Sequence, residues 1–333
     1  SVAFVGLRRG PQFDAWQLER HRTHVPGIVA YTASICPGCH GRWIIETFGL
    51  NGKSMCFSCR RVISQGEIFE AIEKKERIIV FGDFDSDGIT STAILTQAIA
   101  DLGGIVSYRI PDRSVDNHGM KNYLLDEIAT KKVSLVVTCD CGINDFEQVA
   151  YAKSIGLDVI VTDHHSPKKE KFPTEAVAVI NPKLDKNFSE QELSGSAVAL
   201  KFVQALAETK WKNKSESAQF WQKFIEISAI GVVADCVDLV GENRLIVQLG
   251  LQKMLQTEWH GLSELLAADQ NASKNISAET IGFYIAPHLN AASRIGDRLL
   301  AAQLFLGNPD NSKKRIWAFK GVEVINDHLN TKD

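Results

Sequence analysis

The sequence predicts an α/β protein built on a parallel β-sheet, with a mostly helical region after the sheet and a small metal-binding module before it. Three observations predict this architecture. Between residues 70 and 180, short apolar strand patterns alternate with helical patterns, as in consecutive βαβ units. After residue 192 the apolar spacing becomes helical. Before the sheet, cysteines occur in two Cys-x-x-Cys pairs.

The elements follow one another in a regular order. Apolar runs predict strands at 77–82, 105–110, 133–138, 157–162 and 176–180, with helices at 89–102, 121–131 and 145–155. Right-handed crossovers through these helices make the strands parallel. Helical spacing then predicts helices at 194–208, 217–233, 243–256, 260–268, 277–286 and 297–306. The expected units are an N-terminal arm without clear periodicity (1–33), a zinc ribbon (34–66), the sheet domain (70–240), a helical subdomain completing it (241–310) and a charged C-terminal connector helix (311–333).

Length and composition exclude several classes of protein. The 333 residues carry a net charge of −3, which argues against a wholly basic nucleic-acid coat but leaves room for local basic patches. No stretch approaches the ~20 apolar residues that a membrane span requires, and the chain does not open with a signal-peptide pattern. We therefore expect a soluble, cytoplasmic protein without a membrane partner. The expected host is a prokaryotic or phage-infected cell.

Acidic residues and histidines follow the predicted strands directly. They are Asp83, Asp85, Asp87, Asp140, Asp163, His164 and His165. Ligands of parallel sheets bind beyond the carboxyl ends of the strands, so these residues are expected at one edge. Closely spaced carboxylates repel one another unless cations neutralise them. Hard oxygen donors suit Mg²⁺ or Mn²⁺, histidine favours Mn²⁺, and two such ions form the usual clamp for phosphodiester hydrolysis.

The order Asp-x-Asp-x-Asp-Gly, Asp-x-Gly and Asp-His-His resembles the DHH phosphoesterase superfamily. Four further stretches resemble its RecJ branch. They are Ile110–Arg113 with His118-Gly119, Leu193–Gly195, Gly231–Asp235 and Ile285–Arg294. The resemblance runs from about residue 70 to the end, and it makes residues 70–240 the expected DHH catalytic domain.

The resemblance also implies a role for each site residue. One metal would be held by Asp83, Asp85 and Asp140, and the other by Asp87, Asp140, His164 and Asp235, with Asp140 as the bridge. Among the residues implied in catalysis, His165 and Arg113 would steady charge on the phosphate, and Asp163 would orient a ligand. The implied nucleic-acid contacts are His118, His288, Asn290 and Arg294, although His118 and His288 are equally well read as polar surface residues.

Some positions depart from the family pattern. His288 stands where relatives carry an arginine, Ser293 replaces a glycine, and Asn117-His118 replaces Gly-Tyr. These changes affect the expected substrate binding more than the expected metal chemistry. The family's second domain, DHHA1, with its Gly-Gly-Gly-His loop, is not recognisable. Either the chain is cut short, a partner supplies that surface, or the N-terminal module substitutes for it.

The two cysteine pairs fit a tetrahedral structural zinc site made of Cys36, Cys39, Cys56 and Cys59. The alternative is four unrelated thiols. The segment resembles the zinc ribbons of primases and topoisomerases, which suggests a surface that faces DNA. A docking surface for a replication partner is the rival interpretation.

The leading functional hypothesis is a metal-dependent exonuclease for single-stranded DNA. The resemblance implies 5′ to 3′ polarity and a place in DNA repair, recombination or replication. Its expected partners are single-stranded DNA and, as further candidates, a single-strand-binding protein or other replication and recombination proteins. Two alternatives remain: a phosphodiesterase for short oligonucleotides or cyclic dinucleotides, and a non-catalytic replication scaffold.

Overall fold

The computed structural model describes residues 31–35, 42–46, 57–113, 115–168, 171–184, 192–268, 276–294 and 298–307. Residues 31–35, 42–46, 57–64, 292–294 and 298 are described by their backbone alone. The chain divides into two compact units, Ser1–Ile63 and Ser64–Asp333. In the first unit, β1 (Tyr31–Ile35) pairs antiparallel with β2 (Arg42–Glu46). Because β1 begins at Tyr31, the expectation of an irregular arm is wrong for residues 31–33.

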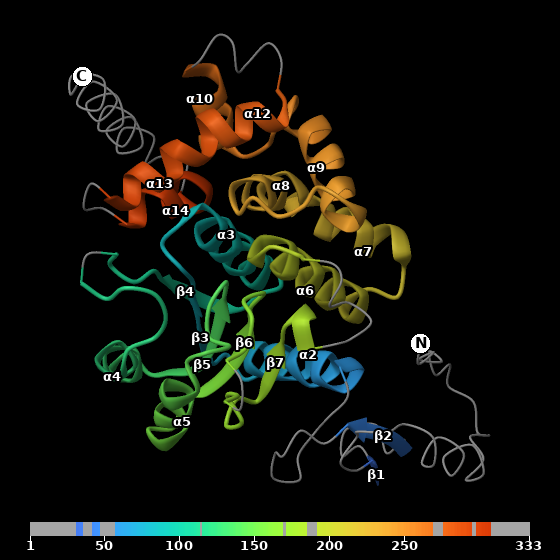
Figure 1. The fold of residues 1–333 in the computed structure, drawn as a ribbon, viewed down its shortest axis with the longest axis vertical. Coiled ribbons are helices and arrows are strands. Elements are labelled where there is room, and N and C mark those ends of the chain that lie inside the picture. The colour runs from blue at the N-terminus through green and yellow to red at the C-terminus, as the bar shows by residue number, and fades with distance from the viewer. Residues whose placement is uncertain are drawn as a thin grey trace. The chain divides into compact units, whose positions relative to one another are not determined.

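The second unit is built on a five-stranded parallel sheet, so the predicted fold class is confirmed. The strand order is β4-β3-β5-β6-β7 (Figure 1). The strands are β3 (Arg77–Phe81), β4 (Ile105–Arg109), β5 (Val133–Cys139), β6 (Asp158–Thr162) and β7 (Ala178–Ile180). Phe81 is in register with Thr138, and Cys139 with Thr162. The carboxyl ends of β3, β5 and β6 therefore meet at one edge.

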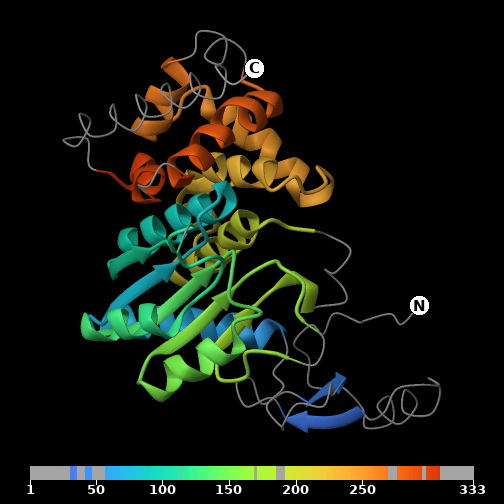
Figure 2. The same ribbon diagram turned by 60° about the vertical axis from the view of Figure 1, so that its left-hand side comes forward.

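Helices cover both faces of this sheet. They are α2 (Phe57–Glu73), α3 (Ser86–Asp101), α4 (Asn122–Thr130), α5 (Phe146–Ser154) and α6 (Gly195–Lys210). Figure 2 shows helices on both sides of the sheet. Ile78 and Val80 join the core beneath α2, α3 and α6, whereas Ile79 and Phe81 join the core beneath α4 and α5. Successive side chains of a strand point to opposite faces, so burial on both faces explains the uninterrupted apolar run of β3.

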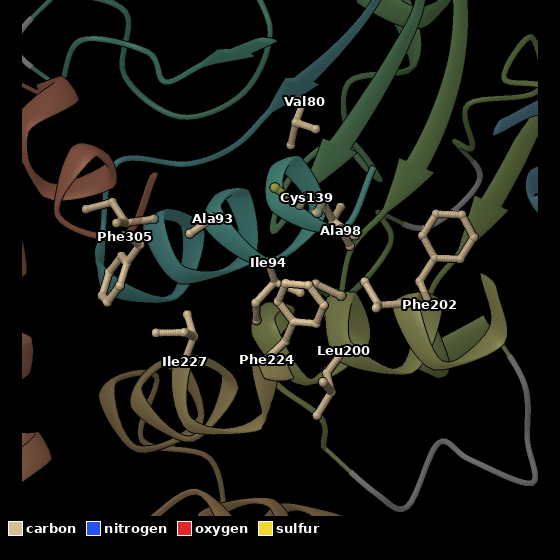
Figure 3. Close-up of a cluster of buried hydrophobic side chains, with 14 of the residues drawn as sticks. Val80, Ala93, Ile94, Ala98, Cys139, Leu200, Phe202, Phe224, Ile227 and Phe305 are labelled. Atoms are coloured by element: carbon tan, nitrogen blue, oxygen red, sulfur yellow. The ribbon is translucent and has the colours of Figure 1, made fainter. Parts of the chain in front are cut away.

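A helical region packs on α3 and α6. Its elements are α7 (Lys214–Trp221), η2 (Gln222–Phe224), α8 (Ile225–Ala234), α9 (Gly241–Met254), α10 (His260–Ala268), α12 (Ala278–Thr280), η3 (Ile281–Ile285), α13 (Ala286–Arg294) and α14 (Arg298–Leu306). A separate 3₁₀ turn, η1 (Pro182–Leu184), follows β7. Figure 3 shows the shared core, in which Ile94, Leu200 and Phe224 gather between α3, α6 and α8. No helix in the described part of the chain has both the length and the apolar character needed to cross a bilayer.

The prediction of a single helix at 217–233 is wrong, because a 3₁₀ turn, η2, separates α7 from α8. Two side chains from the following segment donate hydrogen bonds to carbonyl groups of this turn. Lys253 Nζ donates to the carbonyl of Gln222 at 2.9 Å, and Trp259 Nε1 donates to the carbonyl of Lys223 at 3.1 Å. The break is thus stabilised by contacts that are distant in sequence.

The helix expected at 277–286 is also interrupted and continues beyond its expected end. After α12, a π-helical turn, η3, leads into α13, and the amide of Ala286 bonds to the carbonyl of Ile281 five residues earlier. Pro287 has no N–H and cannot donate to the carbonyl four residues before it, which disfavours a regular α-helix there. Single π turns are rare and concentrate at functional sites.

Candidate metal centre

The first acidic residues lie where β3 passes into α3. Asp83 is 3% exposed, and its Oδ1 accepts a 2.7 Å hydrogen bond from the amide of Phe84. Asp85 is the N-cap of α3 and accepts from the amide of Gly88 at 2.9 Å. Asp87 lies in the first turn of the same helix. A helix N-terminus stabilises nearby negative charge, so this turn tolerates carboxylates that would otherwise repel one another.

Asp87 also fixes the start of α6. Its Oδ2 accepts from the amide of Gly195 at 2.6 Å, and its Oδ1 accepts from the amide of Ser196 at 3.0 Å. These amides open a helix and have no acceptor within it. A carboxylate oxygen has more than one lone pair, so both oxygens keep capacity for a cation.

Asp140 follows β5 in a strained backbone conformation. Its φ is +59°, a region that side-chain-bearing residues seldom adopt. Strain of this kind persists where the surrounding structure imposes it, commonly at functional sites. Gly195 permits the packing, since a Cβ there would lie 2.6 Å from Asp140 Oδ1.

The Asp163-His164-His165 segment follows β6. Asp163 Oδ1 accepts from the amides of His164 and His165 at 2.7 and 3.0 Å, and it lies 2.8 Å from His165 Nδ1. Asp163 Oδ2 accepts from the amide of Ile143 at 2.9 Å. Asp163 is therefore occupied in holding the two histidines in position.

The ligand-type atoms gather in three overlapping groups, and within each group they lie within 4.8 Å of one another. The groups are Asp83, Asp85 and Asp140; Asp87, His164 and Asp235; and Asp140, His164 and His165. His164 Nε2 is 3.0 Å from Asp140 Oδ1 and 3.9 Å from Asp87 Oδ2, and His164 Nδ1 is 3.7 Å from Asp235 Oδ2. The structure thus brings together all six residues named as metal ligands.

Two atoms at the centre of these groups are buried without a hydrogen bond. Within the described residues, neither Asp140 Oδ1 nor His164 Nε2 has a hydrogen-bond partner, although the two atoms lie 3.0 Å apart. Buried polar atoms are rarely left unpaired. A cation would satisfy both atoms, and the set of carboxylates with one imidazole is the donor chemistry that Mn²⁺ prefers and Mg²⁺ accepts. The residues present therefore fit a divalent metal.

Without a cation, ionising the carboxyl groups of this site is unfavourable in free energy. Burial raises the pKa of Asp83, Asp87 and Asp140, and neighbouring carboxylates add to each shift. Burial likewise raises the pKa of Asp235 to about 7, helped by the charges of Asp87 and Asp85. A bound cation would reverse this effect by favouring the charged carboxylates.

The pKa values of the two histidines shift in opposite directions. Burial lowers the pKa of His164 despite the nearby charge of Asp87, so its neutral form, the form that binds metals, is favoured. The hydrogen bond with Asp163 raises the pKa of His165 against the effect of burial. Although burial opposes its charge, the pKa of Asp163 is lowered by His165 and by the amides of His165 and Ile143. His165 is thereby suited to carry positive charge.

The loop after β4 brings two further predicted residues to the metal loop, by which we mean Asp83–Asp87. His118 Nδ1 is 2.6 Å from Asp83 Oδ2, and its ring lies 4.4 Å from the ring of Phe84. The guanidinium of Arg113 lies over the same phenylalanine at 5.0 Å. Both His118 and Arg113 are exposed. Sequence reasoning missed Phe84 as their common support, although its place between two aspartates was a usable signal.

Two of the predicted nucleic-acid contacts on α13 have partners inside the protein. His288 Nδ1 is 2.6 Å from the carbonyl of Tyr284. Asn290 Oδ1 accepts a 2.9 Å hydrogen bond from the amide of Ser86. Arg294 lies on α13, but its side chain is outside the described residues.

Asn181 was missed by sequence reasoning. It is fully buried, and its Nδ2 donates to the carbonyl of His165 at 2.9 Å. It directly follows β7, and this strand-end position was the signal that could have found it.

The zinc prediction is not tested by the structure. Cys36, Cys39 and Cys56 lie outside the described residues, as does the side chain of Cys59. The zinc ribbon remains a prediction from the cysteine spacing.

A comparison with protein-family models matches residues 77–232 to the N-terminal domain of the DHH family. This part of the chain belongs to the DHH family. The matched residues include β3 to β7 and most of α8, and they end three residues before Asp235. All the strand-end ligands proposed from the sequence therefore lie within the DHH domain.

Proteins similar to this DHH domain include RecJ exonucleases. The single-stranded-DNA-specific exonuclease RecJ of Bacillus subtilis is 36% identical over 229 residues, which are 68% of this chain and 28% of that protein. A crystal structure of exonuclease RecJ bound to manganese matches with a TM-score of 0.71 at 31% identity, covering 82% of this chain and 66% of that one. RecJ of Thermus thermophilus in complex with Mn²⁺ matches with a TM-score of 0.69 at 30% identity, covering 81% and 38%. The chain thus spans less than a third of the length of its curated Bacillus relative.

Proposed function

We propose that this chain carries the hydrolytic site of a metal-dependent exonuclease acting on single-stranded DNA from the 5′ end. The observation that carries the proposal is that Asp140 Oδ1 and His164 Nε2, both buried at the centre of the carboxylate groups, have no hydrogen-bond partner among the described residues. The relatives described as single-stranded-DNA-specific exonucleases support the substrate class. Because the chain spans only part of their length, activity and substrate are proposals for this protein.

Two ions are proposed, shared among the six clustered ligands. Asp83, Asp85 and Asp140 would hold one ion, and Asp87, His164 and Asp235, together with Asp140, would hold the other. Bound Mn²⁺ or Mg²⁺ would supply Lewis acidity and lower the pKa of water. This protein's contribution is to hold carboxylates at fixed positions before any cation arrives.

Two residues of the chain would contact the phosphate group, and a third would orient one of them. His165, half-exposed and with a raised pKa, is suited to donate a charge-assisted hydrogen bond to a phosphate oxygen. Arg113, held over Phe84, is suited to a second such contact. Asp163 would keep the His165 ring oriented through its 2.8 Å contact with Nδ1.

The wider roles are also proposals. We place the enzyme in DNA repair, recombination or replication in a prokaryotic or phage-infected cytoplasm, with a single-strand-binding protein or another replication or recombination protein as its partner. His118, His288 and Arg294 would contribute nucleic-acid contacts, and the four cysteines would hold a structural zinc ion that stabilises a DNA-facing module. The domain bounds 70–240 and 241–310 remain part of the same proposal.

The proposal is tested by offering substrates side by side. The protein is incubated with Mn²⁺ and end-labelled single-stranded DNA, duplex DNA, a dinucleotide or a cyclic dinucleotide. We expect release of mononucleotides from single-stranded DNA, with the 5′ label lost first. Asp140→Ala removes the shared ligand. It should lower the rate of mononucleotide release by about 10³-fold or more, because catalysis depends on the ions.

Asp101→Ala is the matched control. Asp101 is an exposed carboxylate at the opposite end of α3, so its loss should leave turnover unchanged. Turnover confined to dinucleotides or cyclic dinucleotides would contradict the exonuclease proposal and favour the small-substrate alternative. No turnover of any substrate would contradict both and favour the scaffold.

A further inference from the structure

We propose that Asn290 is a positioning residue that holds the metal loop in its ligand-competent shape, and that its side chain serves α3 rather than DNA. This inference rests on the proposed metal site and deepens it. It assigns a definite task to α13, which follows the π turn and packs on α3 (Figure 1).

Two hydrogen bonds form the joint between α13 and the metal loop. The amide of Ser86 donates to Asn290 Oδ1 at 2.9 Å, and Ser86 Oγ donates to the carbonyl of Ala286 at 2.9 Å. Ser86 is 1% exposed and stands between Asp85 and Asp87. Both bonds therefore act on the residue that links the two proposed metal sites.

The backbone geometry explains why an acceptor is needed at this place. Ser86 is the first residue of α3, so its amide has no acceptor within the helix. A buried amide without a partner is unfavourable, and water has poor access to a residue this buried. Asn290, 204 positions away in sequence, supplies the missing acceptor. Without it, the turn that directs Asp85 and Asp87 would be free to rearrange.

The chemistry of the amide side chain separates this role from a DNA contact. Positioning of the loop uses the oxygen of Asn290 as an acceptor, whereas a phosphate contact would use its nitrogen as a donor. Asn290→Asp keeps the acceptor and removes the donor, and its negative charge would repel phosphate but not a cation. Asn290→Ala removes both. If Asn290 positions the loop, only Asn290→Ala should be harmful. If it contacts phosphate, both variants should be harmful.

The test measures Mn²⁺ binding directly, by calorimetric titration of the metal-free full chain, alongside kcat and KM on single-stranded DNA. We expect Asn290→Ala to weaken Mn²⁺ binding roughly 10- to 100-fold, the usual effect of losing a residue that orients ligands, and to lower kcat. Asn290→Asp should bind Mn²⁺ within about threefold of the unmodified protein. Ser86→Ala removes the other hydrogen bond between α13 and the metal loop, and it should also weaken Mn²⁺ binding. The effects of Ser86→Ala and Asn290→Ala should not add in the double variant, because both changes break the same contact.

Asn213→Ala is the matched control for an asparagine-to-alanine change. Asn213 caps α7 on the surface through the amide of Ser215, so Mn²⁺ binding should not change. Wild-type-like Mn²⁺ binding by Asn290→Ala with a raised KM alone would overturn the inference and leave the metal site standing. Absence of Mn²⁺ binding by the unmodified protein would overturn the proposed function and this inference together.

Discussion

Asp87 contributes both to the stability of the fold and to the proposed metal site. Its carboxylate accepts two amide hydrogen bonds from the start of α6 and lies 3.9 Å from His164 Nε2. A substitution at Asp87 would therefore disturb both a helix terminus and a proposed ligand. Asp140 is the cleaner probe of chemistry, since one of its oxygens has no hydrogen-bond partner among the residues described.

The raised pKa of Asp235, about 7 compared with an ordinary 3.8, predicts a pH-dependent cost to the metal-free fold. A carboxyl whose pKa is higher in the folded state stabilises that state below about pH 4 and loses this contribution as pH rises through 7. Asp235→Asn removes the titrating group. In the presence of a chelator, the melting temperature of the variant relative to the unmodified protein should therefore be lowest near pH 4 and increase towards pH 8.

Mn²⁺ provides the control for this pH experiment. Metal binding favours the ionised carboxylate, so saturating Mn²⁺ at pH 8 should stabilise the unmodified protein more than Asp235→Asn. A metal-free variant whose relative melting temperature falls between pH 4 and pH 8 would contradict the assignment of a buried, repelled carboxylate at Asp235.

At the scale of elements, the start of α6 has no room for a larger side chain at Gly195. A Cβ on Gly195 would lie 2.6 Å from Asp140 Oδ1 and 2.7 Å from Asp140 Cβ. We predict that Gly195→Ala destabilises the fold by about 1–3 kcal/mol, the usual cost of overpacking, and weakens Mn²⁺ binding by displacing Asp140. Chemical denaturation with and without Mn²⁺ measures both effects.

Gly66→Ala is the matched control. Gly66 lies within α2, and no described atom comes within 4 Å of a Cβ placed there. Because alanine is the better helix former, this change should stabilise the protein by roughly 0.5–1 kcal/mol. Equal effects of the two substitutions would show that the close approach to Asp140 is not what constrains residue 195.

Sequence patterns predicted the elements whose formation depends on local spacing. The strands of the sheet were predicted because burial on both faces requires unbroken apolar runs such as Ile78–Phe81. The break between α7 and α8 was not predicted, since it is stabilised by Lys253 and Trp259 from a later segment. The π turn before α13 had one local signal, Pro287, but its position also depends on packing against α3 and α8.

At the scale of the whole molecule, one edge of the sheet collects residues from β3, β5, β6 and α8. Topology alone explains why the residues at the strand ends lie close together, because parallel strands bring their carboxyl ends to one edge. Asp235 is different, since only its resemblance to a family motif singled it out before the structure placed it 3.7 Å from His164. The bond between Ser86 and Asn290 could not be read from the sequence, because nothing in local spacing pairs residues 204 positions apart.

The most direct test of the central claim is an anomalous-scattering measurement at the manganese edge on crystals of the protein grown with Mn²⁺. The account predicts two peaks at the carboxyl edge of the sheet, one among Asp83, Asp85 and Asp140 and the other among Asp87, His164 and Asp235. Asp140→Asn should reduce the occupancy of both. Manganese bound elsewhere on the protein, with no peak among these residues, would contradict the account.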